Sequence, residues 1–429
     1  MESRDTYELR REYPEYVAAM ERNYRWNLAA LVTDQSFFGL SLTLLSYSTV
    51  LPAFVRHLSD RNILVGLISS VYSAGYFAAQ LPGAFLVHGR RRRKPAIVWI
   101  AVLERVSVVV LALTVGLVGR LATPWVLALF FLAMAIKSVS EGLISPAYSD
   151  FVSKSIAVRR GRFYAITSVV AGGVSLAGSY AMKVILDGKP FPGNFLDLFW
   201  LGLVVSFASL AAITCYREEP FPEAPERTRF WDFFKEAPKA LREQRDFRRL
   251  IAIRGILGLG MLATPFFTVY AMDTFALGSG AVGEFTLIMT AVGMLAAVAS
   301  GWLGDNKGYR SVLLVGAFTG ALAPLLMVLV PEKVTAYVVF PLLTIAGTAV
   351  AQAVTNLTME LSPPEETARF VGIANTVLAP VVTVGPLLAG WMVDGLSYNA
   401  LFVTTAVLSV VGLLMVYFSV SEPRLERAG

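Results

Sequence analysis

The most constraining feature of the sequence is a series of twelve apolar stretches, each long enough to cross a lipid bilayer. A membrane-spanning helix needs about 20 mainly apolar residues, because the hydrocarbon core is roughly 30 Å thick. Charge clusters, glycines and prolines separate one stretch from the next. The twelve stretches are 27–54, 63–87, 96–118, 124–148, 163–185, 196–216, 249–272, 281–303, 311–330, 335–358, 368–392 and 398–420. The sequence therefore predicts an all-α polytopic membrane protein with twelve transmembrane helices.

The amino-acid composition agrees with this class and excludes several others. The 429 residues are 55% apolar and 16% charged, whereas soluble domains are about 45–50% apolar and about 25% charged. This difference excludes an ordinary soluble enzyme, a disordered protein and a fibrous protein. The single cysteine, Cys215, excludes a disulfide framework, and two histidines are too few for a zinc or iron centre built from imidazoles. We expect neither a metal nor a cofactor.

The positions of the basic residues predict the orientation of the chain. If both termini are cytoplasmic, the cytoplasmic segments hold 28 of the 37 Lys and Arg residues and the opposite loops hold six. Cytoplasmic loops of membrane proteins carry such an excess. Both termini are therefore predicted to be cytoplasmic. The net charge of +6 then reflects orientation in a membrane, and no nucleic-acid partner is expected.

One long polar stretch divides the apolar segments into two groups of six. It contains an amphipathic sequence, RFWDFFKEAPKALREQRDFRRL, which is typical of a helix lying on a membrane surface. The predicted parts are a cytoplasmic surface helix (1–26), an N-terminal six-helix bundle (27–216), a cytoplasmic linker with an amphipathic helix (217–248), a C-terminal six-helix bundle (249–420) and a cytoplasmic tail (421–429). Similar sequences, GRFYAI and ARFVGI, open the fifth span of each half and indicate an internal repeat.

A glycine- and arginine-rich motif occupies the loops that follow the second and eighth spans. In the second half the motif consists of Gly301, Leu303, Asp305, Gly308 and Arg310. With twelve spans in two halves and this loop motif, the chain resembles the major facilitator superfamily over about residues 27–420. The resemblance implies a secondary transporter with a substrate site at mid-membrane between two pseudo-symmetric bundles. It also implies that the motif loops act as gates.

The loop of the first half departs from the motif at one position. Gly83 is present and a basic run begins at Arg90 and Arg91, but Val87 stands where the motif has an acid. We therefore expect the first-half gate to depend on other contacts, such as the basic run against cytoplasmic acids. The expected gating residues are Gly83, Arg90, Arg91, Gly301, Asp305, Gly308 and Arg310.

Charged residues inside the predicted spans are the strongest candidates for a functional site. Each costs at least about 2.5–3.5 kcal/mol to place near the bilayer centre. Five of them fall in the first half: Asp34, Glu104, Arg105, Lys137 and Glu141. At roughly 1.5 Å rise per residue, the three acids lie on the order of 10–14 Å from the inner boundary and share one layer. Three acids face two bases, so one carboxylate is in excess.

An unpaired buried carboxylate has the property that proton coupling requires, because burial favours its protonated form. We predict that Asp34 and Glu141 couple transport to protons, with Lys137, Glu104 and Arg105 as charge partners. Lys137 and Glu141 lie four residues apart and can pair on one helix face. The family resemblance places spans one and four on the central cavity and span three outside it. It therefore implies that Glu104 and Arg105 brace the bundle.

The second half offers mainly neutral polar residues for substrate contact. Arg254 is the one charged residue that we identify inside its spans, near the cytoplasmic end. The predicted substrate cavity is lined by Asp34, Arg254, Gln352, Thr355, Asn356 and Asn375. Small polar residues also form ordinary hydrogen bonds between membrane helices, and this remains the alternative for each neutral residue.

These observations together favour a secondary active transporter that works by alternating access in the plasma or inner membrane. We expect a monomer that exports a small amphipathic organic molecule and is driven by the proton gradient. The sequence contains no phosphate-binding loop for ATP and no convergent nucleophile and base, so we predict neither an ATP-driven pump nor an enzyme. Alternatives are a lipid or lysolipid translocator, an uptake symporter, or a receptor or scaffold that does not transport.

Overall fold

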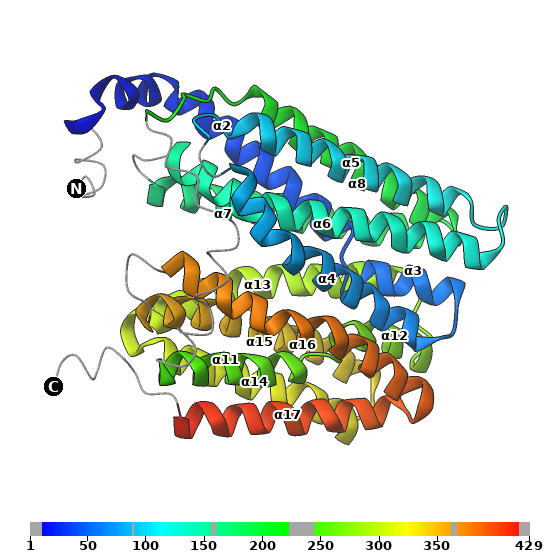
Figure 1. Ribbon diagram of the computed structural model, residues 1–429. Helices are drawn as coiled ribbons and strands as arrows, with labels where there is room; N and C mark the ends of the chain where they lie inside the picture. The colour runs from blue at the N-terminus through cyan, green and yellow to red at the C-terminus, as the bar shows by residue number, and fades with distance from the viewer. Residues whose placement is uncertain (1–10, 88–89, 156–159, 223–243, 362–366, 420–429) are drawn as a thin grey trace. The chain divides into compact units, whose positions relative to one another are not determined.

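The computed structural model describes residues 11–87, 90–155, 160–222, 244–361 and 367–419, and every element of regular structure in them is a helix (Figure 1). Eleven of the helical segments are long and apolar enough to cross a membrane. The first predicted span is not among these eleven segments. It is divided between two helices, α2 (Pro14–Leu44) and α3 (Val50–Leu58). The predicted fold, an all-α polytopic membrane protein, is confirmed.

The chain forms two compact units. Unit 1 comprises Met1–Ser46 and Gly75–Thr228, and unit 2 comprises Tyr47–Ala74 and Arg229–Gly429. The boundary therefore runs through a helix, α4 (Asn62–Val87), whose first half packs in unit 2 and whose second half packs in unit 1. The division into two six-helix bundles with a surface helix and a tail remains a prediction. Most of the predicted linker, residues 223–243, lies outside the described residues.

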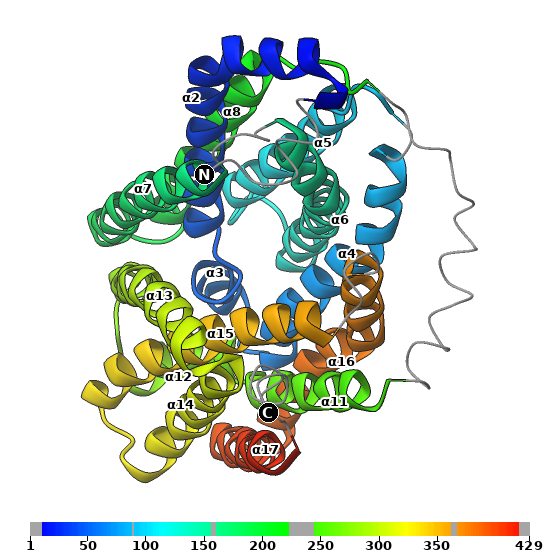
Figure 2. The ribbon, with the colours of Figure 1, turned by 90° about the vertical axis from the view of Figure 1, so that its left-hand side faces the viewer.

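Unit 1 is a bundle in which α2 and α5 each pack against two other helices. Besides α2 and the second half of α4, its helices are α5 (Lys94–Gly116), α6 (Thr123–Ser155), α7 (Arg160–Gly188) and α8 (Gly193–Cys215). α2 contacts α7 and α8, and α5 contacts α6 and α8 (Figure 2). α2, α5, α6 and α8 thus enclose a common interior, and the candidate site lies there.

Unit 2 contains the remaining helices, and its core holds two pairs of stacked aromatic rings. Its later helices are α11 (Arg245–Gly260), α12 (Thr264–Thr274), α13 (Gly280–Lys307), α14 (Tyr309–Leu329), α15 (Lys333–Leu361), α16 (Thr367–Gly395) and α17 (Tyr398–Ser419). α14 contacts α15 and α17, α13 contacts α15, and α3 packs against α12 and α13. The rings of Phe267 and Phe402 stack at 4.5 Å, and those of Phe285 and Phe340 at 4.1 Å.

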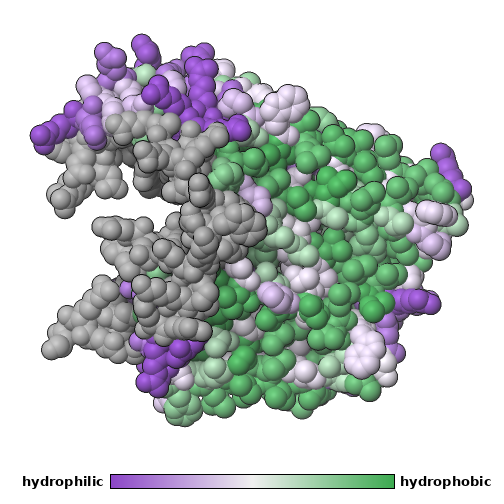
Figure 3. Space-filling view, in the orientation of Figure 1, coloured by the Kyte–Doolittle hydropathy of each residue, from purple (hydrophilic) through white to green (hydrophobic). Residues whose placement is uncertain are grey.

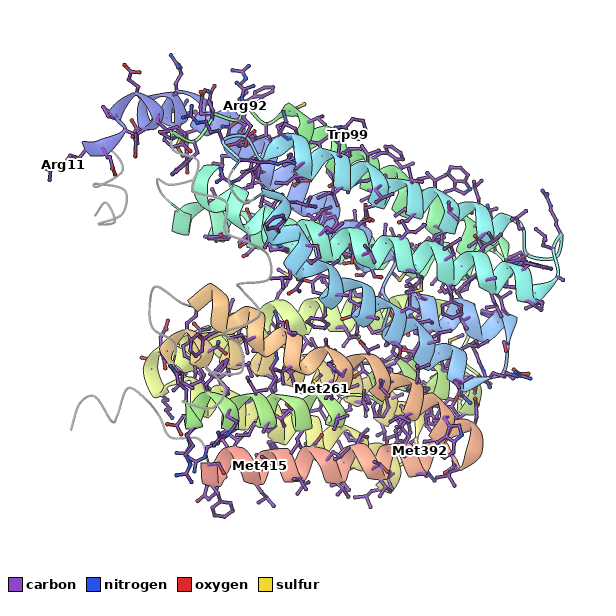
Figure 4. The ribbon with its side chains drawn as sticks, viewed as in Figure 1. Arg11, Arg92, Trp99, Met261, Met392 and Met415 are labelled. Atoms are coloured by element: carbon purple, nitrogen blue, oxygen red, sulfur yellow. The ribbon has the colours of Figure 1, made fainter. Side chains whose placement is uncertain are left out.

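The first and seventh predicted spans are each divided into two helices. The first is interrupted at residues 45–49, between α2 and α3, and the seventh at residues 261–263, between α11 and α12. Met261 marks the second break (Figure 4). A break at corresponding positions of the two halves agrees with the internal repeat seen in the sequence.

Large apolar side chains cover the outward faces of the helices. Trp99 on α5 is 75% exposed, and Val298 on α13 is exposed to the same extent. Figure 3 shows apolar side chains over much of the helical surface, with hydrophilic ones gathered at the start of α2. Arg11 and Arg92 stand at that end of unit 1 (Figure 4). Because exposed apolar surface on this scale is stable only against lipid, these faces contact the bilayer.

Gly308 connects α13 to α14 with a backbone conformation that side chains disfavour. Its φ is 82° and its ψ is 159°, a region populated almost only by glycine, where another residue costs about 1–3 kcal/mol. We expect Gly308→Ala to lower the free energy of unfolding by this amount, measured by thermal unfolding in detergent. Gly301→Ala is the control, because a Cβ at Gly301 meets no atom within 4 Å. An equal loss of stability in both variants would contradict this account of the loop.

Candidate functional site

All five charged residues predicted in the spans of the first half lie in the interior of unit 1. Asp34 is on α2, Glu104 and Arg105 are on α5, and Lys137 and Glu141 are on α6. Their exposed fractions range from 1% to 7%. A charge that is buried this deeply in a membrane protein needs partners, because desolvation alone costs several kcal/mol.

Four of the five residues form a continuous chain of ion pairs. Arg105 Nη1 lies 2.8 Å from Glu104 Oε2, and Lys137 Nζ lies 3.4 Å from Glu104 Oε1. Lys137 also pairs with Glu141, one helical turn further along α6. The two carboxylates and two bases therefore compensate each other, with Glu104 in contact with both cations. The Glu104–Arg105 pair, which the family resemblance expects to brace the bundle, thus joins directly to the Lys137–Glu141 pair.

Asp34 is connected to this chain through a hydroxyl group. Ser209 Oγ on α8 donates to Asp34 Oδ1 at 2.7 Å, and Tyr148 Oη on α6 donates to Asp34 Oδ2 at 2.7 Å. Arg105 Nη2 in turn donates to Ser209 Oγ at 2.7 Å. Among the described residues, Asp34 thus accepts hydrogen bonds from two neutral hydroxyls. The cation of Arg105 is linked to Asp34 through one of them, Ser209.

The charge balance of the cluster identifies Asp34 as the excess carboxylate. Glu104 and Glu141 each contact a cation directly, whereas Asp34 is held by two hydroxyls. Hydrogen bonds to an ionised carboxylate are roughly twice as strong as neutral ones, so the two hydroxyls stabilise the charged form of Asp34 without neutralising it. Chemically, this arrangement can hold a carboxylate that gains and loses a proton.

Tyr148 and Ser209 were not among the residues predicted from the sequence. A signal for Tyr148 was present, because Lys137, Glu141 and Tyr148 follow one another at intervals of four and seven residues and share a face of α6. Ser209 had no comparable signal, because serine is common in membrane helices and its partner, Asp34, is 175 residues away in the sequence. Glu284 on α13 was also overlooked as a charged residue within a span, and it accepts a hydrogen bond from Tyr337 Oη at 2.5 Å.

The residues predicted for the substrate cavity in the second half lie on three helices of unit 2. Thr355 Oγ1 and Asn356 Nδ2 donate to carbonyl groups of their own helix, α15, and Gln352 Nε2 donates to the Ala297 carbonyl on α13 at 3.3 Å. Arg254 on α11 and Asn375 on α16 are half-buried. Gln352 Oε1 is buried and accepts no hydrogen bond from any described residue. Their role in binding substrate stays a prediction.

The predicted gating loop of the second half is built around the turn at Gly308. A side chain at Gly304 would collide with the Tyr309 ring, at 2.4 Å, so the loop is tightly closed. Arg310 Nη2 donates to the Tyr417 carbonyl at the end of α17, at 2.8 Å. Asp305 is exposed and has no ion pair or hydrogen bond with a described residue. The structure therefore places Asp305 at the end of α13 and Arg310 at the start of α14, without pairing them.

In the first half, Val87 is buried in an apolar cluster with Ile97 and Phe151. The backbone N–H groups of Arg93 and Lys94 donate to Glu218 Oε1 at 2.6 Å and 3.2 Å. Glu218 therefore caps the start of α5, within the basic run.

The other predicted gating residues of the first half lie at the same end of α4. Arg90 and Arg91 are exposed. Gly83 packs closely against the backbone of Leu143 on α6.

The fold and the buried charge cluster together define a multi-pass membrane protein with ionisable groups held inside a helical bundle. The sequence matches the Major Facilitator Superfamily in two overlapping segments, residues 36–381 and 261–429. The chain belongs to this superfamily, and it is a transporter rather than an enzyme.

Individual relatives agree with this assignment. The chain is 26% identical to the uncharacterized protein Rv2209 of Mycobacterium tuberculosis over 378 residues, which cover 82% of this chain and 69% of the relative. A POT family transporter in complex with 5-aminolevulinic acid superposes with a TM-score of 0.71 at 14% identity, covering 93% of this chain and 96% of its own. The xylose transporter XylE from E. coli gives a TM-score of 0.66 at 15% identity, covering 92% and 98%. At such identities, the solved structures show a shared fold.

Proposed function

We propose that the protein is a proton-coupled secondary transporter in which Asp34 carries the proton. The observation that supports this proposal is the single excess carboxylate of the buried cluster, which two neutral hydroxyls hold next to a compensated chain of ion pairs. Glu141, the other predicted coupling residue, is paired with Lys137. We therefore assign Glu141 to keeping the cluster balanced and Asp34 to proton transfer.

The substrate that we propose is a small amphipathic organic molecule, exported across the plasma or inner membrane by a monomer. Structures with this fold include transporters whose names specify nucleosides and xylose, which supports a small organic substrate. The apolar helices around the ionisable group of the first span favour an amphipathic one. Arg254, Gln352, Thr355, Asn356 and Asn375 are our proposed substrate contacts from unit 2.

The proposal is tested with purified protein in proteoliposomes. Compounds that raise the thermal unfolding temperature are first selected from a library, because a ligand that binds the folded state stabilises it. Uptake of a selected compound is then measured with and without an imposed pH gradient. We expect accumulation against a concentration gradient only when the pH gradient is present, and transport that ignores the pH gradient would contradict proton coupling.

A further part of the proposal is that Asp305 and Arg310 stabilise a closed cytoplasmic gate. The intact loop motif supports this role, and the exposed carboxylate of Asp305 is free to meet a cation that approaches in another conformation. Asp305→Asn should slow transport at least about tenfold while leaving thermal stability and substrate affinity unchanged, since charged hydrogen bonds are worth about 1.5–3 kcal/mol and about 1.4 kcal/mol corresponds to tenfold in rate. Asn306→Ala on the same exposed turn is the control. Transport by Asp305→Asn at the parent rate would exclude the gate role.

A further inference from the structure

Ser209 makes a different kind of hydrogen bond from the other two hydroxyl residues of α8. Ser206 Oγ and Thr214 Oγ1 each donate to the carbonyl group three residues earlier in the helix, at 2.8 Å and 2.7 Å. Such bonds to the preceding turn are usual for serine and threonine inside a helix. Ser209 Oγ, which is fully buried, instead donates to Asp34 Oδ1 on α2. The hydroxyl of Ser209 is therefore directed at the excess carboxylate rather than at its own helix.

Protonation of Asp34 requires one of its two hydroxyl partners to change its hydrogen bond. The ionised carboxylate accepts at both oxygens, from Ser209 at Oδ1 and from Tyr148 at Oδ2. A protonated carboxyl group keeps one acceptor oxygen and gains one O–H donor. Asp34 is 6% exposed, and a buried donor without an acceptor lowers stability. One of the two hydroxyls must therefore reverse from donor to acceptor whenever Asp34 carries a proton.

Ser209 can make this reversal with the groups that already surround it. Its oxygen has two lone pairs, and one of them accepts from Arg105 Nη2 at 2.7 Å. Rotation of the hydroxyl proton toward the preceding turn of α8 opens the second lone pair to the O–H of Asp34. In that turn the Ser206 carbonyl already accepts from Arg105 Nε at 3.0 Å, so the acceptor for the rotated proton is the Val205 carbonyl, four residues before Ser209.

Tyr148 has less freedom to reverse than Ser209. Its ring packs beside Phe151, with the ring centroids 6.1 Å apart, and a phenolic O–H stays close to the plane of its ring. The Tyr148 oxygen is also hydrogen-bonded to the Gln35 side chain. Because the single phenolic proton is donated to Asp34, the Gln35 amide is the donor in that bond and occupies an acceptor position of the oxygen. Tyr148 therefore continues to donate to Asp34 Oδ2 in both protonation states.

The reversal of Ser209 leaves the ion pairs around Asp34 in place. Arg105 donates to Ser209 Oγ in either state, so its pair with Glu104 is kept. On α8 the group that faces Asp34 is the neutral hydroxyl of Ser209. The charged and titratable groups that face this site from the other helices are Glu104 and Arg105 on α5, Lys137, Glu141 and Tyr148 on α6, and Tyr164 on α7. Proton uptake by Asp34 therefore breaks no ion pair of the cluster.

We propose that Ser209 is a hydrogen-bond switch for Asp34, donating to the ionised carboxylate and accepting from the protonated one. The proton of Asp34 then lies on Oδ1, which faces Ser209, and the carbonyl oxygen is Oδ2, which faces Tyr148. The inference rests on the proposed function, in which Asp34 carries the proton. It adds the oxygen atom that receives the proton and the residue that accommodates it.

The switch is tested by the infrared carbonyl band of protonated Asp34 in the purified protein. The band is recorded as the difference between acidic and alkaline pH and is identified by its absence in Asp34→Asn. A hydrogen bond donated to a carbonyl oxygen lowers its stretching frequency. Tyr148→Phe removes the bond to Oδ2 and should move the band to higher frequency, whereas Ser209→Ala should move it much less. The opposite pattern would overturn the proposal, because it would place the proton on Oδ2.

The pH at which half of the band is present gives a second measurement. Ser209→Ala removes a charge-assisted hydrogen bond from ionised Asp34 and a weaker neutral one from the protonated form, so this midpoint should rise by about one pH unit. Ser209→Thr keeps a hydroxyl and should retain the parent midpoint. Ser206→Ala is the control, because the Ser206 hydroxyl bonds within α8. An unchanged midpoint in Ser209→Ala would overturn the role of Ser209.

The outcome is separable from that of the proposed function, because the band is recorded without substrate. The predicted band shifts together with uptake that ignores a pH gradient would support the switch and contradict proton coupling. Gradient-driven uptake together with the opposite pattern of band shifts would overturn the switch and leave proton coupling in place. A parent protein without an Asp34 band at any pH would overturn both.

Discussion

Asp34→Asn is expected to abolish accumulation of substrate against its gradient while leaving exchange of substrate intact. Asparagine imitates a permanently protonated aspartate, so the variant cannot release a proton during the cycle. The amide oxygen can still accept from one of the two hydroxyls of Tyr148 and Ser209, and the amide N–H can donate to the other, so the helix packing around the site should be retained. For one proton per substrate, a pH gradient of about one unit supports an accumulation of about tenfold, and this should fall to about one in the variant.

The measurement is substrate uptake into proteoliposomes with an imposed pH gradient, compared with exchange in its absence. Asp187→Asn on α7 is the matched control, because it makes the same change in unit 1 at a carboxylate whose side chain is 55% exposed. It should accumulate substrate as the parent protein does. If Asp34→Asn still concentrates substrate when the gradient is applied, the proton is carried elsewhere, and Glu141→Gln becomes the variant to measure.

The sequence was sufficient to predict the fold because the apolar stretches repeat at the length of a bilayer. It was insufficient at the breaks, because a span such as 27–54 is long and apolar enough to be predicted as one helix, whereas the helix after its break, α3, packs against α12 and α13. The assignment of residues 47–74 to unit 2 could likewise not be predicted from the sequence. Residues 47–74 pack in unit 2 through contacts such as Asn62 with Asp394, which are 332 residues apart in the sequence.

The candidate site shows the same division between local and distant information. The Lys137–Glu141 pair is predictable because the two residues lie one turn apart on one helix. That Glu104 contacts both Arg105 and Lys137 is not predictable, since it depends on the rotation of α5 against α6. The hydroxyl partners of Asp34 belong to α6 and α8, and only the assembled bundle brings them to it.

Removing the cation at the centre of the cluster should have the largest effect on stability. Lys137 contacts both Glu104 and Glu141 inside unit 1, where its side chain is 8% exposed. Lys137→Met keeps most of the volume of the side chain but leaves a buried carboxylate without its partner. Breaking a buried pair in this way costs about 3–5 kcal/mol, and we expect a loss of this size in thermal or denaturant unfolding of the purified protein.

The pH dependence of the stability and a second substitution show whether the uncompensated charge causes the loss of stability in Lys137→Met. Protonation of the orphaned carboxylate removes the buried charge, so the loss of stability in Lys137→Met should be smaller at mildly acidic than at mildly alkaline pH. The double variant Lys137→Met/Glu141→Gln removes both partners and leaves Glu104 paired with Arg105, so it should recover most of the stability of the parent protein. This recovery is the coupling that a double-mutant cycle measures for residues in one network. A double variant that is as unstable as Lys137→Met at both pH values would mean that packing around the lysine stem, rather than charge compensation, holds α5 and α6 together.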